Sequence, residues 1–408
     1  MAASWLKGNV GVMIISWFLF AISSALTYPY LSKYMELLGA SEVDIGLATS
    51  LGSLANMLAV LPGGVLTDAI GRRRSIIIGT WGVTATQFLY ASVVNWQMFV
   101  VVYVVDSALH FYQPALTAIL LDSLPPERRG GGMMLTAILP QVPWLFLPPV
   151  GGYLLDSMGL MGMRVSFILS GIISATVALF RMRALEETVA VRRVPPRELA
   201  PALARSLAFW ENLTDFDHFT IYVAVLGLLV NMASIPLQRF GVLYATKVLG
   251  LDNTMWGAIQ SAATGIAIVF GLVMTPVIDR APRATAMFSG LMLTASGFLI
   301  AGLWRHKVAI ALAALTASVG SEVVTAVRRA VIGDRVEQIR RGKAMGASLA
   351  LEYLGVVVGG LTGGLLYSFS PSLSFVVSAV IVVASSIYLA PHFLRDLGLW
   401  DEGRRSVL

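Results

Sequence analysis

The apolar residues of this chain are gathered into runs of 20 residues or more, and this arrangement limits the fold more than any other feature. A helix rises 1.5 Å per residue, so such a run crosses the ~30 Å hydrocarbon core of a bilayer. There each backbone N–H and C=O must be bonded within its own segment, so the runs are predicted to be helices. Twelve spans are expected, at 9–35, 44–67, 75–94, 97–121, 131–155, 163–182, 217–246, 254–278, 284–304, 307–331, 344–369 and 372–393.

The composition agrees with a protein embedded in lipid and excludes several other classes. Hydrophobic residues make up 57% of the chain and charged residues only 13%, about half of what a soluble domain carries. The net charge of +6 does not indicate nucleic-acid binding, because the basic residues follow the loops and form no continuous patch. The chain has no cysteine and its four histidines show no ligand spacing. We therefore expect no disulfide, metal site or cofactor.

The Lys and Arg residues are distributed unevenly between alternate loops. With the N-terminus in the cytoplasm, 23 of them lie on the cytoplasmic side, including the stretch from Arg181 to Arg205, and 6 lie outside. This bias predicts a multi-pass plasma-membrane protein with both termini in the cytoplasm. In the long polar connection 183–216, Leu199, Leu203 and Leu207 have helical spacing and predict a short amphipathic helix on the inner surface.

The two halves of the sequence resemble each other at an offset of 211 or 212 residues. The matches fall at the same place in each half: Asp68 with Asp279, Asp122 with Asp334, Arg128-Arg129-Gly130 with Arg340-Arg341-Gly342, and Gly151-Gly152 with Gly363-Gly364. Such a recurrence indicates duplication of a six-helix unit, related by an axis along the membrane normal. The predicted domains are 1–185 and 217–408, joined by a cytoplasmic linker over 186–216.

A motif between the second and third spans carries a family resemblance. Its residues are Gly64, Asp68, Gly71, Arg72 and Arg73, although Ala69 stands where a basic residue is usual. On this motif and its repeat, the chain resembles the major facilitator superfamily over essentially its whole length. The resemblance implies an all-α membrane protein with two pseudo-symmetric six-helix bundles around a central cavity. It also implies that a monomer moves small molecules by alternating access.

The charged residues of this motif are expected to form a gate. Arg72 should bridge Asp68 and Asp122 as a two-pronged donor. The resemblance implies that Asp68 also approaches the start of the eleventh span, near Gly342, where the helix dipole favours a carboxylate. In the second half, the same role is expected of Asp279, Arg283 and Asp334. The alternative, that the charges only set topology, is favoured for Arg73 and Arg74.

Polar residues inside two apolar spans form the candidate site. The fourth span carries Asp106, His110, Gln113 and Thr117, and the tenth carries Ser318, Glu322, Thr325 and Arg329 at an offset of 212. The spacing of 4, 3 and 4 places each row on one helical face. Ionisable groups in such spans cost at least ~2.5–3.5 kcal/mol, so they are functional candidates. The two rows are expected to face each other across the cavity, with Tyr30 and Asn231 from the first and seventh spans.

Asp106, His110 and Glu322 are predicted to include the proton-coupling group, because a carboxyl in a dry cavity and a histidine titrate within reach of neutral pH. Arg329 is expected either to bind an anionic substrate or to compensate Glu322, and Arg328 to point elsewhere. Glu352 in the eleventh span either joins the cavity or pairs with an arginine of the tenth. The competing interpretation is an internal lattice of salt bridges, with Asp106 paired to His110 and Glu322 to Arg329.

These features favour a proton-coupled secondary transporter that exports a small lipophilic or cationic compound. Pro148, Gly151 and Gly152 resemble part of an antiporter motif, with Leu147 where a glycine is expected. The arginine typical of the fourth helix in drug–proton antiporters is absent, which leaves open an uptake symporter for an organic anion or sugar. A sensor or scaffold derived from a transporter is a further alternative. An enzyme is not expected, since the only His–Asp neighbours, Asp217 and His218, are interpreted as a helix cap.

Overall fold

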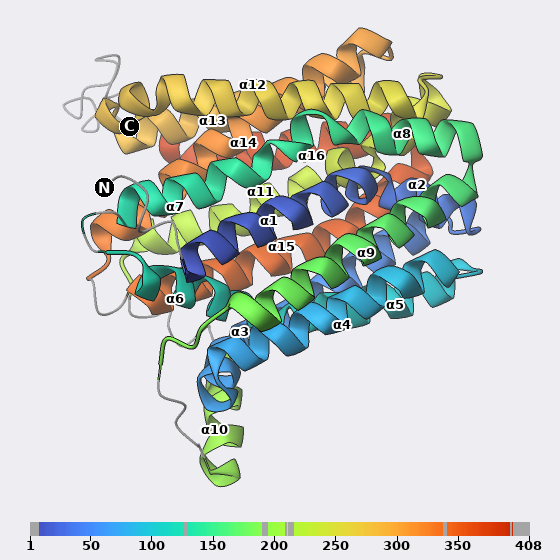
Figure 1. Cartoon of the computed structure of the whole chain (residues 1–408). Helices are drawn as coiled ribbons and strands as arrows, with labels where there is room; N and C mark the ends of the chain where they lie inside the picture. Colours follow the sequence, from blue (N-terminus) through green and yellow to red (C-terminus); the bar gives the residue numbers. More distant parts are fainter. Residues whose placement is uncertain are drawn as a thin grey trace, which may run out of the picture. The chain divides into compact units, whose positions relative to one another are not determined.

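The computed structural model describes residues 8–125, 127, 129–189, 195–208, 210, 216–337, 341–391 and 394, and its regular elements in these ranges are all helical (Figure 1). The first half contains α1 (Asn9–Thr27), η2 (Tyr28–Tyr30), α2 (Leu31–Leu37), α3 (Glu42–Ile70), α4 (Arg72–Ser92), α5 (Trp96–Leu109), η3 (His110–Tyr112), α6 (Gln113–Ser123), α7 (Arg129–Ile138), η5 (Leu139–Gln141), η6 (Pro143–Leu145), α8 (Leu147–Met158), α9 (Leu160–Ala184) and α10 (Pro196–Leu207). The second half contains α11 (His218–Leu243), η8 (Tyr244–Val248), α12 (Asn253–Arg280), α13 (Arg283–Leu303), α14 (Lys307–Arg335), α15 (Arg341–Phe369), α16 (Pro371–Ser386) and η9 (Ile387–Leu389).

Eleven helical segments in the described ranges are long and apolar enough to cross a membrane. The expected span over 75–94 is also helical, as α4, but it is not among the eleven because threonines interrupt its apolar character. All three, Thr80, Thr84 and Thr86, are buried, and Thr80 and Thr84 donate to backbone carbonyls one turn earlier. The polar groups of α4 therefore face protein, where a polar side chain can be satisfied.

Large apolar side chains lie on the outer surface of the helices. Val101 is 64% exposed and Val273 is 65% exposed, and Phe146 and Ile387 are similar. In water, apolar surface of this extent marks an interaction site. On segments of this length it indicates that lipid is the surrounding solvent.

Three expected spans are confirmed as helical segments of membrane length, but each contains 3-10 turns that break the α-helix well inside its length. The breaks lie at η2, at η3, and at η5 with η6, next to Pro29, Pro114, Pro140 and Pro143. Proline has no N–H and its ring collides with the carbonyl four residues earlier, so the chain switches to tighter turns there. The break at η3 matters most, because it divides the row of polar residues on the fourth span.

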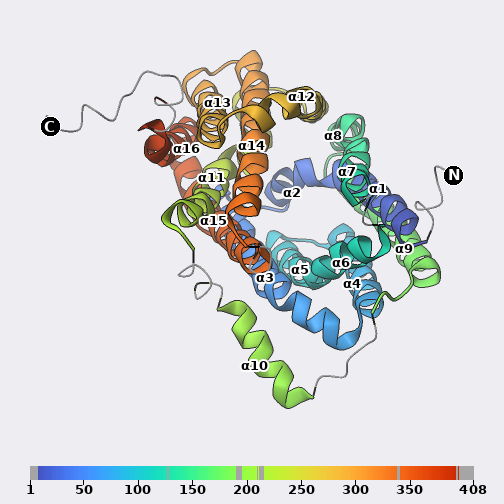
Figure 2. The same cartoon turned by 90° about the vertical axis from the view of Figure 1, so that its left-hand side faces the viewer.

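The chain forms two compact units. The first comprises 1–209 together with 242–261, and the second comprises 210–241 and 262–408. The segment Val242–Ser261, which belongs to the second half by sequence, thus packs with the first unit. In the first unit, α4 packs on α9 and α5, and α1 packs on α9 (Figure 2). In the second, α13 contacts both α14 and α16.

Two glycines fix the position of η3. A Cβ on Gly63 of α3 would lie 2.1 Å from the carbonyl oxygen of Phe111, and one on Gly79 of α4 would lie 2.0 Å from the ring of Tyr112. Only a residue without a side chain allows such close approach. The short α10 packs on α3, and its Leu199, Leu203 and Leu207 are half-buried, so the helix predicted in the polar connection is confirmed.

Candidate functional site

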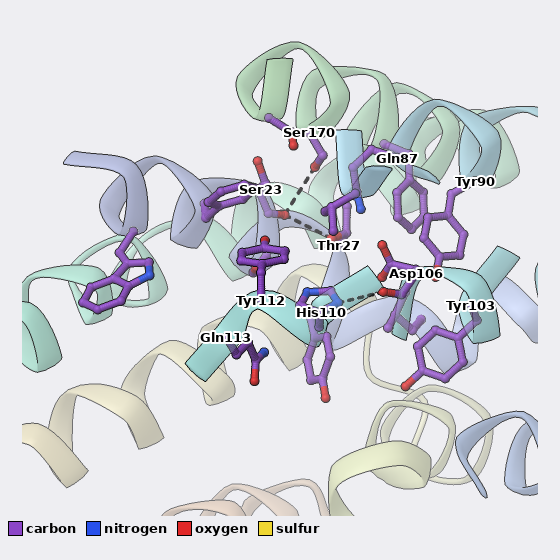
Figure 3. A pocket seen from close by; sticks show the side chains of 18 of the residues that line it. Ser23, Thr27, Gln87, Tyr90, Tyr103, Asp106, His110, Tyr112, Gln113 and Ser170 are labelled. Atoms are coloured by element: carbon purple, nitrogen blue, oxygen red, sulfur yellow. Dashed lines mark hydrogen bonds between the residues drawn. The ribbon is translucent and has the colours of Figure 1, made fainter. Parts of the chain in front are cut away.

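A cavity of about 320 Å³ lies inside the first unit (Figure 3). Its walls come from α1 with η2 and the start of α2, from α4, from α5 with η3 and α6, and from α9. Asp106, His110 and Gln113 of the predicted polar row line it, whereas Thr117 is exposed and does not. The expected single face ends at η3, because the 3-10 turn changes the direction of every side chain that follows it.

His110 closes the break in the helix. Its backbone N–H donates to Ser107 and Ala108 instead of to the carbonyl of Asp106, four residues earlier. That freed carbonyl lies 2.7 Å from Nδ1 of the His110 ring. In the neutral ring, Nδ1 therefore carries the proton and donates it to this bond, and Nε2 is left as an acceptor. A side chain thus satisfies a backbone group that the apolar surroundings would otherwise leave unpaired.

The carboxyl of Asp106 is held by a neighbouring helix. Thr86 of α4 donates its hydroxyl to Oδ1 of Asp106 at 2.5 Å, and Tyr90 lies on the same wall of the cavity (Figure 3). His110 contacts the backbone carbonyl of Asp106 rather than its carboxyl. The structure therefore does not contain the direct Asp106–His110 salt bridge that the competing interpretation predicted.

Arg181 also lines this cavity, and the sequence analysis missed it. It was counted among the loop charges, yet its side chain is fully buried in the last turn of α9. Nη1 donates to Thr80 at 2.9 Å, and the guanidinium lies 5.1 Å from the centre of the Phe20 ring. Nε and Nη2 have no hydrogen-bond partner among the described residues. A buried charge left unpaired costs several kcal/mol, and a desolvated cation–π contact offsets about 2 kcal/mol of that cost.

The polar row of the second unit has different surroundings. Glu322 and Arg329 are exposed within their unit, and Thr325 is half-buried. Asn231 on α11 donates to the carbonyl of Gly227 in its own helix at 2.9 Å. Across the described residues, Glu322 and Arg329 do not form the ion pair that the competing interpretation required. That the two rows face each other stays a prediction.

Glu352 pairs with an arginine of the tenth span, one of the two roles expected for it. The partner is Arg328, whose Nη2 lies 2.8 Å from Glu352 Oε1 and 2.9 Å from the hydroxyl of Ser348. Nε of Arg328 donates to the carbonyl of Val223 at 3.1 Å. The guanidinium is 4% exposed and joins α11, α14 and α15 within the second unit. Arg328 was expected to point away from the polar row, but its burial and its pairing with Glu352 were not specified by the helical spacing.

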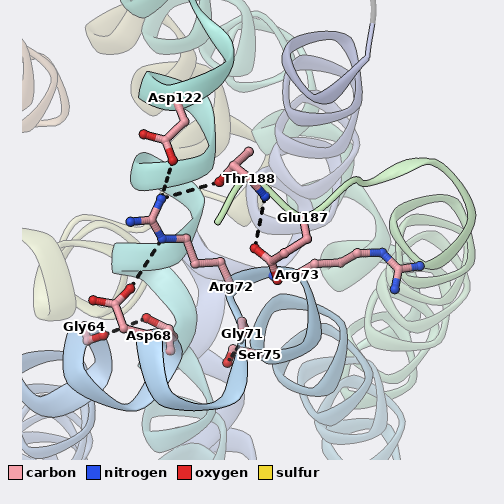
Figure 4. A network of polar contacts seen from close by, with 10 residues as sticks. Gly64, Asp68, Gly71, Arg72, Arg73, Ser75, Asp122, Glu187 and Thr188 are labelled. Atoms are coloured by element: carbon pink, nitrogen blue, oxygen red, sulfur yellow. Dashed lines mark hydrogen bonds and ion pairs between the residues drawn. The ribbon is translucent and has the colours of Figure 1, made fainter. Parts of the chain in front are cut away.

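The bridge predicted for Arg72 is present (Figure 4). Its Nη1 lies 2.5 Å from Oδ2 of Asp122, and its Nε lies 3.4 Å from Oδ1 of Asp68. In the second unit, Nη2 of Arg283 lies 3.2 Å from Oδ2 of Asp334. The same ion pair thus occurs in both repeats. The side chain of Asp279 is outside the described residues, and the gating role stays a prediction.

Arg73 does more than mark a loop. Its guanidinium donates to the carbonyls of Leu185 at 2.6 Å and Met182 at 2.7 Å, and its backbone N–H donates to Glu187 (Figure 4). These are the free carbonyls at the end of α9, where a cation is favourable. Arg74 is exposed. The motif thereby also holds the end of the helix that carries Arg181.

The first unit includes polar contacts to the segment Val242–Ser261. Asp156 of α8 accepts from the backbone N–H groups of Asn253 and Thr254 at 3.0 and 2.8 Å, and so caps α12. The Tyr30 hydroxyl donates to the carbonyl of Pro148 at 2.5 Å and lies 3.2 Å from that of Asn253. Tyr30 is fully buried and does not line the cavity of the first unit, and its place at a cavity between the two halves stays a prediction.

A salt bridge joins the same segment to α2 and α3. Nζ of Lys247 lies 2.9 Å from Glu36 and 3.5 Å from Glu42, and Lys33 also contacts Glu36. None of these groups stood out in the sequence, because each is an isolated charge at the end of a span. Lys247 and Glu36 are more than 200 positions apart, so their pairing follows only from the tertiary structure.

Comparison with known proteins identifies the family. The sequence model of the Major Facilitator Superfamily matches residues 13–271 and 240–399 of this chain. The chain belongs to this superfamily. Its members are carriers, and the expected fold, two six-helix repeats of an all-α membrane protein, is confirmed. The protein is therefore a multi-pass membrane transporter of small molecules.

Relatives in the superfamily are distant. An uncharacterised MFS-type transporter of Methanocaldococcus jannaschii is 23% identical over 403 residues, covering 92% of this chain and 97% of that protein. The quinolone resistance protein NorA of Staphylococcus aureus is 20% identical over 273 residues, covering 67% and 66%. Solved structures with the same fold include a peptide transporter POT in complex with sulfate, at 13% identity and TM-score 0.77 with 95% of each chain covered. Another is the human organic anion transporter MFSD10, at 16% identity and TM-score 0.69, covering 93% and 98%.

Proposed function

We propose that this transporter works by alternating access and is coupled to protons through Asp106 and His110. The observation that carries the proposal is a carboxyl group that lines a cavity in an apolar helical unit, beside the ring of His110, which lines the same cavity. A carboxyl that alternates between a closed apolar cavity and water binds and releases a proton as its surroundings change. His110 is the neighbouring group that could exchange this proton, because its ring lies one helical turn from Asp106 and lines the same cavity.

Alternation requires contacts at each end of the molecule that can break and re-form. Arg72 with Asp122 provides such a contact at the cytoplasmic side of the proposed topology, and Lys247 with Glu36 provides one at the outer side. Ion pairs of this exposure contribute about 1 kcal/mol or less, so a ligand can shift the balance between states. We further propose that Asp68 meets the start of α15 when the inner side closes, as the family resemblance implies.

For the direction of transport, we propose efflux of a small lipophilic compound by a monomer in the plasma membrane, with both termini in the cytoplasm. The similarity to NorA, a quinolone resistance protein, supports export, and Trp17 and Phe20 give the cavity an aromatic wall. Uptake of an organic anion together with protons is the second candidate. The buried guanidinium of Arg181 in the same cavity favours it.

Proteoliposomes test the coupling. With the outside made acidic, antiport accelerates release of preloaded ethidium, and symport accelerates entry of 2-naphthoate. Asp106→Asn should abolish the response to the pH gradient in either assay, whereas Glu198→Gln, an equal charge change on the exposed surface of α10, should keep it. If Asp106→Asn responds to the gradient as the unmodified protein does, Asp106 is not the coupling group.

A further inference from the structure

Arg181 is charged, buried and without a counter-ion in the part of the chain that the structure describes. Nη1 donates to the neutral hydroxyl of Thr80, and the hydroxyl of Tyr112 is a second neutral partner, so no carboxylate there is paired with the guanidinium. Asp106 lines the same cavity, but its carboxyl accepts from Thr86 instead. By contrast, the buried Arg328 of the second unit has three partners, one of them a carboxylate. Among the described residues, Arg181 thus has no carboxylate partner like the one that Glu352 provides for Arg328.

The cavity around Arg181 is suited to an amphipathic molecule. Trp17, Phe20 and Tyr112 give it aromatic surface, and the buried hydroxyl oxygen of Ser23 has no partner among the described residues. A second hollow, of about 410 Å³, lies along α1 next to η5 and shares Trp17, Phe20 and Ser24 with the first. The two hollows together offer apolar room beside a single fixed positive charge.

We propose that Arg181 binds the carboxylate of an aromatic organic anion, and that this anion is a transported compound. The planar guanidinium presents parallel N–H groups that match the two oxygens of a carboxylate. The aromatic side chains then hold the ring of the ligand. This inference rests on the proposed function only in treating the cavity as the transport site.

Phe20 controls access to the charge. Its ring lies over the guanidinium at 5.1 Å and also lines the cavity, while Arg181 itself has no exposed surface. A ligand must therefore move Phe20 aside, which a change of side-chain rotamer achieves. In the absence of ligand, the ring shields and partly stabilises the cation. Replacing Phe20 by a smaller residue should expose the site.

Binding to the purified full-length protein tests the proposal, with 2-naphthoate, its neutral amide 2-naphthamide, and sodium chloride as probes. Titration calorimetry should show naphthoate bound at least about tenfold more tightly than the amide. Arg181→Gln should remove this preference, and Arg181→Lys should keep part of it. Arg183→Gln is the matched control, because Arg183 lies exposed on the same helix end. Phe20→Leu should tighten naphthoate binding or speed its association.

Equal affinity for naphthoate and naphthamide, or a preference that survives in Arg181→Gln, overturns the proposal. Chloride that displaces naphthoate at millimolar concentration would show an inorganic anion site and would overturn the assignment to a carboxylate ligand. If Arg181→Gln does not fold, two measurements still test the proposal. They are the affinity of Phe20→Leu for naphthoate and the preference of the unmodified protein for naphthoate over naphthamide. Proton coupling is read separately from the pH-gradient assay with Asp106→Asn, so either idea can fail alone.

Discussion

Arg72 and Asp122 are joined by an ion pair of 2.5 Å between α4 and the end of α6. The same pair recurs 211 and 212 residues later as Arg283 with Asp334, at 3.2 Å. The arginine and the aspartate of this ion pair thus occupy equivalent positions in the two repeats. Because both pairs are partly exposed, their direct contribution to stability is small, and their effect should appear in the rate of alternation.

Asp122→Asn is expected to slow transport by at least about fivefold while thermal unfolding in detergent changes little. The charge of Arg72 would then have only Asp68, at the longer distance of 3.4 Å. Initial rates in proteoliposomes measure the effect. Arg74→Gln serves as control, because Arg74 is exposed next to the motif. Equal rates in Asp122→Asn and the unmodified protein would remove the gate hypothesis.

The pair formed by Arg328 and Glu352 is predicted to be structural. Glu352→Ala leaves a buried guanidinium without its carboxylate, which typically costs about 3–5 kcal/mol. The midpoint of thermal unfolding should fall clearly. Glu352→Gln, which can still accept a hydrogen bond, should recover part of the loss and keep the response to a pH gradient. A stable Glu352→Gln variant that no longer responds to the gradient would instead make Glu352 a coupling residue.

Asp156 is predicted to hold the start of α12 against α8. Asp156→Asn weakens the charged cap on the N–H groups of Asn253 and Thr254, which is worth about 1 kcal/mol. We expect the end of the first unit that carries Asp156 to open more often. The chain has no native cysteine, so Ser32→Cys, at a buried position of α2, reports this opening by its rate of maleimide labelling.

Asp252→Asn is the control for this experiment. Its carboxyl also caps α12, through the N–H of Met255, but it belongs to the chain segment that leads into the same helix. Labelling at position 32 should therefore rise in Asp156→Asn and stay near the original rate in Asp252→Asn. If the labelling rate rose equally in the two variants, capping of α12 would matter for the opening, and the contact between α12 and α8 would not.

Gly63→Ala should destabilise the first unit by about 1–3 kcal/mol, because the new methyl group would lie 2.1 Å from the carbonyl oxygen of Phe111. The methyl group would belong to α3 and would meet backbone rather than a flexible side chain, so neither helix can move aside easily. Gly333→Ala is the matched change, since nothing lies within 4 Å of its Cβ position on α14. There the substitution should be neutral or raise stability by up to about 1 kcal/mol. Thermal unfolding of both variants in the same detergent gives the comparison.

Asp217 is expected to make stability depend on pH. Hydrogen bonds from Thr220 hold the pKa of its carboxyl below the usual value, with further support from nearby Arg335. The charged form is thus favoured in the folded protein. The charged carboxylate contributes about 1 kcal/mol to the free energy of unfolding, as an N-cap does. This contribution is complete above pH ~4 and is lost as the pH falls through the lowered pKa.

Asp217→Asn separates this effect from other carboxyl groups, because asparagine caps a helix without titrating. The stability difference between the two proteins should shrink as the pH falls from about 6 to 3. Chemical unfolding at several pH values measures it. A difference that stays constant over this range would show that Asp217 does not titrate differently on folding.

The position of Asp217 was predictable from sequence, as were the helices and the motif contact. Each depends on local spacing: apolar length for the spans, four residues between Asp68 and Arg72, and a cap beside His218. The repeat also allowed the pair of Arg283 and Asp334 to be predicted from that of Arg72 and Asp122. The 3-10 turn inside the fourth span was not predicted, although Pro114 was visible, because the apolar length of the span outweighed one helix breaker.

What the sequence by itself determined was a duplicated set of membrane helices with charges at fixed ends, because bilayer thickness and backbone hydrogen bonding leave few alternatives. Only the tertiary structure decided which end-of-span arginines turn inward. Arg181 and Arg183 are two residues apart, yet the first is buried and the second exposed. A helical rotation of about 200° separates their directions, and the neighbours that each direction meets come from distant parts of the chain.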